Sequence, residues 1–483
     1  MDHAEQTRQL EERSVGRLLL EFSIPAILAT IINASYSLIN RFFVGRMIGE
    51  VGITAVTVSF PITTIMIACS MMIGIGSNTL VSIRLGEKNN KEAQRIVGQA
   101  LFLFIMLAVG FLVFGLIFIE PLLKLFGASE QVMPYAKEYL SVSLYGAIFH
   151  ELSYGMNGFL RSEGKPRIAM VTILIAALLN IFFDWLFLCV FRTTIWGAAY
   201  ATILAQAVST SWIIWHYTSG KTLLRWRLRY IRWNTPLAWQ VFLLGLPPCI
   251  MQLVSCVLQG IQNRQLGFYG NLYVKREFGL DNGGDMAISV MGILFVVFMM
   301  VLLPLLGLNQ GLQPIVGYNI GANRFDRVRR ALKLAISAQL MFTVLCGTAI
   351  VLFPEYLIAP FTNPESPDRA ALIHIGGHAL RIVCSVLPLA GIVVIAAGYF
   401  QSNGMPKVAI TLTLFRQVGF LVPLLFLLPW LFETLGNHNG LDGIWAAIMI
   451  SDVGAFLLAT MFFWHELRRL KNGTGVCNSD SGS

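Results

Sequence analysis

The chain has 483 residues, of which 56% are hydrophobic and 13% are charged, and its formal net charge at pH 7 is +9. A soluble globular domain carries about 25% charged residues, so this composition argues against an ordinary soluble domain and indicates a membrane protein. The seven cysteines lack the spacing of a zinc site or a disulfide framework, which excludes small folds held by metals or disulfides.

The first segment, 1–17, mixes acidic residues with arginines and lacks the basic start and cleavage site of a secretory signal. We expect it to be cytosolic. Apolar runs of about 20 residues or more, long enough to cross a bilayer, follow along the whole chain. They are continuously apolar rather than alternating, which predicts helices and not barrel strands. The twelve predicted spans are 18–40, 51–79, 96–119, 139–160, 168–191, 195–217, 237–262, 286–315, 331–353, 372–400, 408–430 and 444–466.

The basic residues are concentrated in connections on one side of the predicted helices. Clusters occur at 84–95, 221–233 and 323–333. With an even number of spans, these connections share a side with both termini. The positive-inside rule places that side in the cytoplasm. The positive charge therefore indicates the topology of a multi-pass inner-membrane protein, with both termini cytoplasmic, and not a nucleic-acid partner.

The sequence contains an internal repeat. FLRSEGKPRIAM at 159–170 matches YFQSNGMPKVAI at 399–410, and two more segments repeat in the same order. Each half therefore holds six spans in the same orientation, an architecture that transporters use for alternating access, with substrate handled between the halves. We predict an N-terminal lobe, a basic cytosolic linker, a C-terminal lobe and a cytosolic tail, at 18–217, 218–236, 237–466 and 467–483.

Several motifs together resemble one transporter family. SLINRFFVG, VSFPI, SIRLGE, FLRSEGKP, GLNQGLQPIVGYNIGA and LDGIW occur in the order found in the multidrug and toxic compound extrusion (MATE) family, and most resemble its bacterial MepA-type branch. The resemblance covers nearly the whole chain. It implies a non-enzymatic antiporter with two six-helix lobes, surrounded by lipid and monomeric, that exports cationic or amphipathic small molecules. It also implies H⁺ or Na⁺ as the coupling ion and no cofactor.

Two polar residues interrupt the apolar stretch LLNIFFDWLF of the fifth span. Asn180 and Asp184 lie one helical turn apart on the same face. An ionisable group at membrane depth is costly unless it is paired or hydrated, so Asp184 is a candidate functional residue. It can exchange a proton, or offer oxygens to Na⁺ together with Asn180, and the resemblance adds Thr202 from the sixth span. The alternative is a hydrogen-bonded cluster with no role in transport.

The chain departs from the family in its first span, where many members have an aspartate and this chain has Asn40. Either Asp184 works with neutral partners, or another acid takes the place of the missing one. The obvious substitute is Glu151 in the fourth span, beside His150. Adjacent residues on a helix point about 100° apart, so these two need not share a cavity. We also include Gln252 and Asp452 as candidate ion or substrate residues.

The second half does not repeat the polar pair, because the internal alignment places Phe420 and Leu424 opposite Asn180 and Asp184. It contains Arg416 in the eleventh span and Asp452 in the twelfth. An unpaired charge in a low dielectric is costly, so we predict a structural ion pair between them. The alternative is that Asp452 forms a second cation or substrate site.

Two prolines and two histidines complete the set of candidates. Pro25 and Pro61 interrupt the backbone hydrogen bonds of their helices and are predicted hinges. His374 and His378 have a spacing that suits a metal, but no third ligand lies nearby in the sequence, so we predict no metal site.

The substrate class follows from the composition of the spans. Eighteen methionines and many aromatic residues suit an adaptable apolar cavity for organic cations. One alternative is a lipid or lipid-linked oligosaccharide flippase, for which we expect several basic residues at mid-depth, where this chain has few. A membrane-embedded enzyme is a weaker alternative, because the spans contain no nucleophile–base or metal constellation.

Overall fold

The computed structural model describes residues 13–219, 222–224, 226–362, 369–435 and 439–471. Within these ranges every regular element is a helix, so the predicted all-α class is confirmed. The elements of the first half are α2 (Val15–Ile48), α3 (Glu50–Gly86), α4 (Asn90–Ile117), α5 (Ile119–Leu125), α6 (Met133–Tyr145), α7 (Ala147–Ser162), α8 (Pro166–Asp184), the π-helix η1 (Trp185–Val190) and α9 (Trp196–Thr218).

The second half follows the same plan after a linker that contains one 3₁₀ turn, η2 (Leu228–Tyr230). Its elements are α10 (Thr235–Phe278), α11 (Gly283–Gly321), α12 (Phe325–Leu352), α13 (Pro354–Ile358), η3 (Ala359–Phe361), α14 (Arg369–Ser385), α15 (Leu387–Ser402), α16 (Pro406–Leu414), the π-helix η4 (Phe415–Leu421), α17 (Val422–Leu435) and α18 (Gly440–Lys471).

Each of the twelve predicted spans coincides with one helix or with two or three consecutive helical elements. In the part of the chain that the structure describes, nine helices are long and apolar enough to cross a membrane, and α14 with α15, bent by 49°, makes a tenth. The remaining two spans are α6 with α7, and α9. The predicted number of twelve is therefore confirmed.

The helices extend beyond several predicted ends. The seventh span was predicted at 237–262, whereas α10 has 44 residues. At 1.5 Å per residue it is about 66 Å long, roughly twice the thickness of the hydrocarbon core. Hydropathy marks only the apolar part of such a helix, because the polar residues at its ends keep the helical hydrogen bonds.

The internal repeat is visible in the backbone. α7 ends at Ser162 and α15 at Ser402, each followed by a glycine with positive φ, 83° at Gly164 and 72° at Gly404. Left-handed backbone of this kind favours glycine and ends a helix. The next helices, α8 and α16, both begin with proline, whose fixed φ suits a first helical position. The same turn therefore connects matching spans in both halves.

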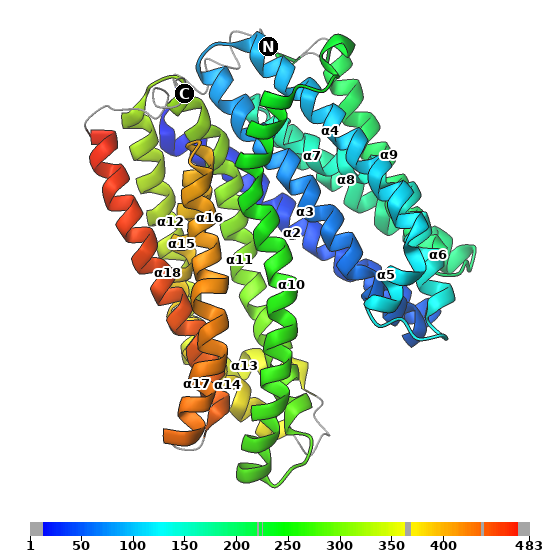
Figure 1. Cartoon of the computed structure of the whole chain (residues 1–483), viewed down its shortest axis with the longest axis vertical. Coiled ribbons are helices and arrows are strands. Elements are labelled where there is room, and N and C mark those ends of the chain that lie inside the picture. Colours follow the sequence, from blue (N-terminus) through cyan, green and yellow to red (C-terminus); the bar gives the residue numbers. More distant parts are fainter. Residues whose placement is uncertain (1–12, 220–221, 225, 363–368, 436–438, 472–483) are drawn as a thin grey trace.

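The two halves lie against each other at the end of the molecule that holds both ends of the described chain, and they diverge toward the other end (Figure 1). One apolar cluster at their contact includes Val81 of α3 together with Leu312 and Ile315 of α11. The contact is close because glycines from each half meet the backbone of the other. A side-chain carbon on Gly86 would overlap the carbonyl oxygen of Tyr318, and one on Gly321 would overlap that of Ile83.

The predicted segment boundaries at 17, 217, 236 and 466 stay predictions. Parts of four predicted segments lie outside the described residues, namely 1–12 of the N-terminal segment, 220–221 and 225 of the linker, 363–368 and 436–438 of the C-terminal lobe, and 472–483 of the tail.

Candidate functional site

Asp184 lies fully buried at the last position of α8, where the π-helix η1 begins. π-helical turns are rare and occur frequently at functional sites. Asn40 of α2 donates from its Nδ2 to Asp184 Oδ2 at 3.0 Å and to Oδ1 at 3.3 Å. The residue that replaces the family's first-helix aspartate therefore lies in direct contact with the remaining carboxylate.

Asn180 lies one turn before Asp184 and contacts the sixth span. Its Nδ2 donates to Thr202 Oγ1 at 3.1 Å, and that hydroxyl donates to the carbonyl oxygen of Ala198 at 3.1 Å. The Asn180 Oδ1 atom is buried and accepts no hydrogen bond from the described residues. A buried acceptor without a donor costs free energy, so each such atom needs an explanation.

The structure thus brings the four predicted ion-coupling residues together from α2, α8 and α9. Their role in transport stays a prediction. Sequence reasoning missed two tyrosines at the same place. Tyr139 of α6 and Tyr36 of α2 both lie close to Asp184. Tyr36 precedes Asn40 by one helical turn and shares its face, a spacing that could have indicated it.

Glu151 forms a second buried polar cluster. It is fully buried on α7, and its Oε2 accepts a hydrogen bond from the Ser70 hydroxyl of α3. The Nδ1 of His150 lies 3.6 Å from Glu151 Oε1, so these adjacent side chains contact each other despite the angle between them. Glu151 accepts from Ser70 and contacts His150, whereas Asp184 accepts from Asn40. Glu151 therefore belongs to a separate site within the first half.

A pair of cysteines connects the halves beside Glu151. A side-chain carbon on Gly76 would overlap the carbonyl oxygen of Val241, and one on Gly245 would overlap that of Met72. α3 and α10 run antiparallel here, and this register places Cys69 opposite Cys249 one turn further along. Cys69 and Cys249 are therefore neighbours across the contact of the two halves. The spacing of the cysteines in the sequence did not indicate this pair.

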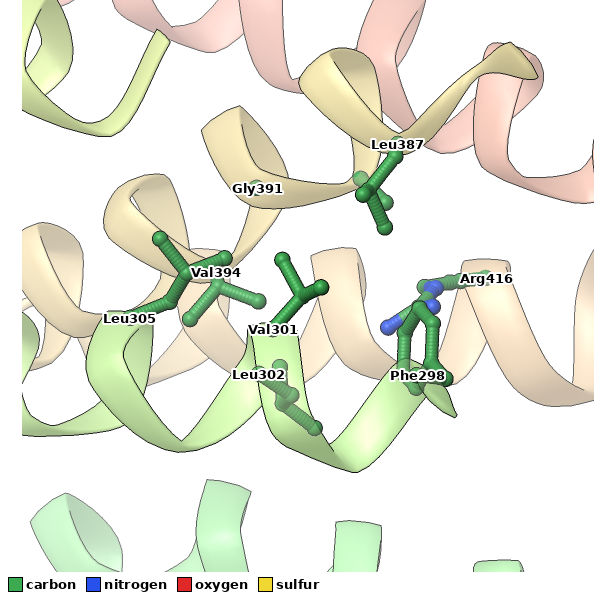
Figure 2. Close-up of a pocket in the computed structure, with 9 residues that line it drawn as sticks. Phe298, Val301, Leu302, Leu305, Leu387, Gly391, Val394 and Arg416 are labelled. Carbon is green, nitrogen blue, oxygen red and sulfur yellow. The ribbon is translucent and has the colours of Figure 1, made fainter. Parts of the chain in front are cut away.

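Arg416 of η4 and Asp452 of α18 form an ion pair, with Arg416 Nε 2.7 Å from Asp452 Oδ1. The Asp452 side chain is almost fully buried. On its other side, Arg416 faces an apolar pocket where α14 and α15 meet at their bend. Figure 2 shows the Arg416 side chain beside the ring of Phe298. The other residues lining the pocket are Val301, Leu302, Leu305, Leu387, Ala390, Gly391 and Val394.

We predict that this pair is structural. Removing one charge by Arg416→Met or Asp452→Asn leaves its partner uncompensated, which costs roughly 3 kcal/mol. The double variant should recover most of the folded protein, because no orphan charge remains. Fluorescence size-exclusion chromatography of solubilised membranes measures this yield. If the double variant loses as much as the two single variants combined, the residues are not energetic partners.

The remaining candidates lie away from Asp184. Gln252 is half-buried on α10. Pro25 is buried within α2 near the glycines of α11 that contact Ser23 and Ile27, whereas Pro61 lies within α3. Their hinge roles stay predictions.

The two histidines of α14 do not build a metal centre in the described part of the chain. His378 Nε2 lies 3.1 Å from Asp442 Oδ2 of α18. No group of three His, Cys, Asp or Glu side chains among the described residues is arranged to hold a metal ion.

Comparisons with known proteins agree with this architecture. The MatE family model matches residues 25–186 and 279–427. Multidrug export protein MepA of Staphylococcus haemolyticus (strain JCSC1435) is 25% identical over 466 residues, which cover 96% of both chains. MepA of Staphylococcus aureus (strain NCTC 8325 / PS 47) is 24% identical over 465 residues, again with 96% of both chains covered. An outward-facing multidrug resistance MATE transporter has a similar fold, with a TM-score of 0.85, 24% identity and coverage of 96% of this chain and 98% of that one.

Proposed function

Because the chain belongs to the MatE family, the multidrug and toxic compound extrusion family, we propose that it exports organic cations or amphipathic drugs in exchange for H⁺ or Na⁺. The relatives named as multidrug export proteins match almost the full length of the chain, which supports drug efflux. The members of this family are membrane transporters and not enzymes. Membership therefore supports a multi-pass membrane transporter.

One observation carries the proposed ion coupling. A carboxylate, Asp184, is buried at the centre of a hydrogen-bonded group one turn from the unsatisfied oxygen of Asn180. When Asp184 gains a proton, its O–H can donate to that oxygen. When Na⁺ binds, the carboxylate and the amide oxygen can share the ion. Either event removes a negative charge from a buried position and satisfies the acceptor, so the site favours cation uptake.

Cation uptake can shift the conformation because Asp184 is tied to α2. Neutralising the carboxylate weakens the charge-assisted hydrogen bonds from Asn40 and frees α2 to repack against α8. Pro25 weakens the backbone ladder of the same helix, at a point where α2 contacts the second half. In this scheme the cation-loaded state binds substrate more weakly and releases it outward, and this differential binding provides the coupling.

The proposal is tested with purified protein in liposomes. Efflux of a fluorescent cationic dye should be driven by an imposed H⁺ gradient, an imposed Na⁺ gradient, or both, and should stop when the gradients are collapsed. The two gradients are applied separately, because this separation identifies the coupling ion. Dye movement that is unchanged without either gradient would contradict antiport.

We predict that the connections after α3, α9 and α11 face the cytoplasm, as the positive-inside rule requires. Single cysteines at Lys91, Arg232 and Asp326 in a cysteine-free background should react with a membrane-impermeant maleimide only after cells are opened. Ser129, exposed in the connection before α6, is the matched control and should react in intact cells. Labelling of any of the first three positions from outside would reverse the proposed orientation.

A further inference from the structure

The linker between the halves is held firmly on the first half. Tyr230 packs directly against Gly98 of α4. A side-chain carbon on Gly98 would lie only 2.6 Å from the Tyr230 Cβ, so this close contact requires glycine. Trp226 stacks on Tyr217, with ring centroids 5.5 Å apart and planes inclined by 18°. Gln94 Nε2 donates to the carbonyl oxygen of Leu223 at 2.9 Å. These contacts turn Trp226 and Tyr230 of the linker inward.

The arginines of the same segment point outward. Arg227, Arg229 and Arg232 are exposed, as is Lys91 at the start of α4. Arg229 lies over the Tyr230 ring, 4.8 Å from its centroid, and donates to the Tyr230 hydroxyl at 3.0 Å. That hydrogen bond, with the charges of Arg229, Arg227 and Lys91, lowers the pKa of the tyrosine. Arg227, Arg229 and Lys91 therefore surround Tyr230 with positive charge, and Arg232 follows two residues later in the chain.

This group differs from two paired arginines on the same side of the protein. Arg84 and Arg95 on the same side pair with Glu87 and Glu92 at 2.8 and 3.1 Å. In contrast, Arg227, Arg229, Arg232 and Lys91 have no ion-pair partner among the described residues. Uncompensated guanidinium groups attract phosphate, to which they can donate in pairs.

The position of these four cations favours a lipid over a soluble anion as the ligand. Trp233 is half-exposed, its Nε1 donates to Thr235 Oγ1 at 2.9 Å, and its ring meets that of Phe102 of α4 edge to face. Tryptophan in such a setting is typical of the membrane–water interface. Below Phe102, the same face of α4 continues as an exposed apolar stripe of Ile105, Met106, Val109 and Val113.

We propose that Arg227, Arg229 and Arg232, with Lys91, bind the phosphate headgroup of an anionic phospholipid whose acyl chains lie along the exposed stripe of α4. The cations and the stripe are adjacent, so one lipid molecule can contact both. Binding anchors the linker, and with it the connection between the halves, to the membrane surface. The site is independent of Asp184 and of the coupling ion.

The test compares lipid retention by full-length variants. Native mass spectrometry of protein released from vesicles of equal phosphatidylglycerol and phosphatidylcholine should show selective retention of phosphatidylglycerol. Triple substitution of Arg227, Arg229 and Arg232 by Gln should reduce this affinity about fivefold for each charge removed. The matched control, Arg84→Gln with Arg95→Gln, removes carboxylate-paired arginines and should retain the lipid. Triple substitution by Lys keeps the charge and should retain most of the selectivity.

Two outcomes would overturn the proposal. Equal phosphatidylglycerol retention in the Gln variant and the control would show that the linker arginines do not bind the lipid. Displacement of the lipid by inorganic phosphate at millimolar concentration would show a site for soluble anions instead. If the Gln variant does not fold, the Lys variant decides, because loss of selectivity there with normal folding also contradicts the proposal. None of these readouts uses transport, so they stand apart from the test of efflux.

Discussion

Replacing Asp184 with asparagine should abolish export against a gradient while leaving a folded protein that still binds substrate. Asparagine matches the size of aspartate and can keep a hydrogen bond with Asn40. We expect the free energy of unfolding to change by less than about 1 kcal/mol, because the desolvation cost of the buried charge disappears together with its charge-assisted bonds. The variant cannot take up a proton or share a cation, so in liposomes dye should only equilibrate.

A swap variant sharpens this prediction. The Nδ2 atom of Asn40 lies 3.0 Å from Asp184 Oδ2. Asn40→Asp combined with Asp184→Asn therefore exchanges the two side chains and places the carboxylate on α2. Gradient-driven efflux should return in part if a carboxylate at this place is what couples transport. Glu163→Gln is the matched control. Glu163 is also a buried carboxylate of the first half, but its hydrogen-bond donor is the backbone N–H of Leu224 in the linker. It should leave the ion dependence of efflux unchanged.

Normal efflux by Asp184→Asn, with unchanged dependence on pH and Na⁺, would limit Asp184 to a structural role. Glu151 would then be the next candidate, since it is the other fully buried carboxylate of the described helical spans in the first half. Glu151→Gln keeps the hydrogen bond from Ser70 and removes the charge, so it would test that role in the same assay.

Oxidation should stop transport by joining Cys69 of α3 to Cys249 of α10. The helices touch at Gly76 and Gly245, and the thiols face each other one turn away. Copper–phenanthroline removes two electrons and two protons from the thiols and forms one disulfide. Alternating access requires the halves to rearrange around the substrate, so a covalent bond across their contact should prevent turnover in the whole cross-linked fraction.

Peptide mass spectrometry measures the disulfide, and dye efflux measures its effect before and after reduction with dithiothreitol. Cys249→Ala removes one partner and should leave efflux insensitive to the oxidant. Cys256→Ala is the matched control, because this exposed cysteine of the same helix is not part of the pair. If fully cross-linked protein still exports, the contact between α3 and α10 stays closed throughout the cycle.

Much of the fold follows from simple rules applied to the sequence. Backbone polar groups need partners in lipid, so long apolar runs are helices, and twelve of them appear where predicted. The turn that ends at Pro166 and Pro406 repeats because the same residues impose the same backbone. The ends of α10 could not be predicted from hydropathy, because helical hydrogen bonding continues where the apolar residues stop.

The residues of the candidate site could be proposed from the sequence, because charged groups are costly in a membrane. The contacts between these residues could not be predicted. Charged groups inside spans are rare and costly, which drew attention to Asp184 and Arg416. The unsatisfied oxygen of Asn180, the bond from Ser70 to Glu151 and the opposition of Cys69 and Cys249 all depend on how helices distant in sequence pack. Spacing along one helix contains no information about the register between two helices.

The reciprocal contact of Gly86 and Gly321 has a consequence for how a duplicated gene can diverge. Each glycine occupies the matching position of the other half and meets the backbone of the other half. Residues that contact only their own half are not constrained in this way, and the position that matches Asp184 is Leu424. A side chain at either glycine would push both halves apart at once, so neither copy can relax this position alone. The contact between the halves therefore constrains both copies together, whereas the interior of each half can differ from that of the other.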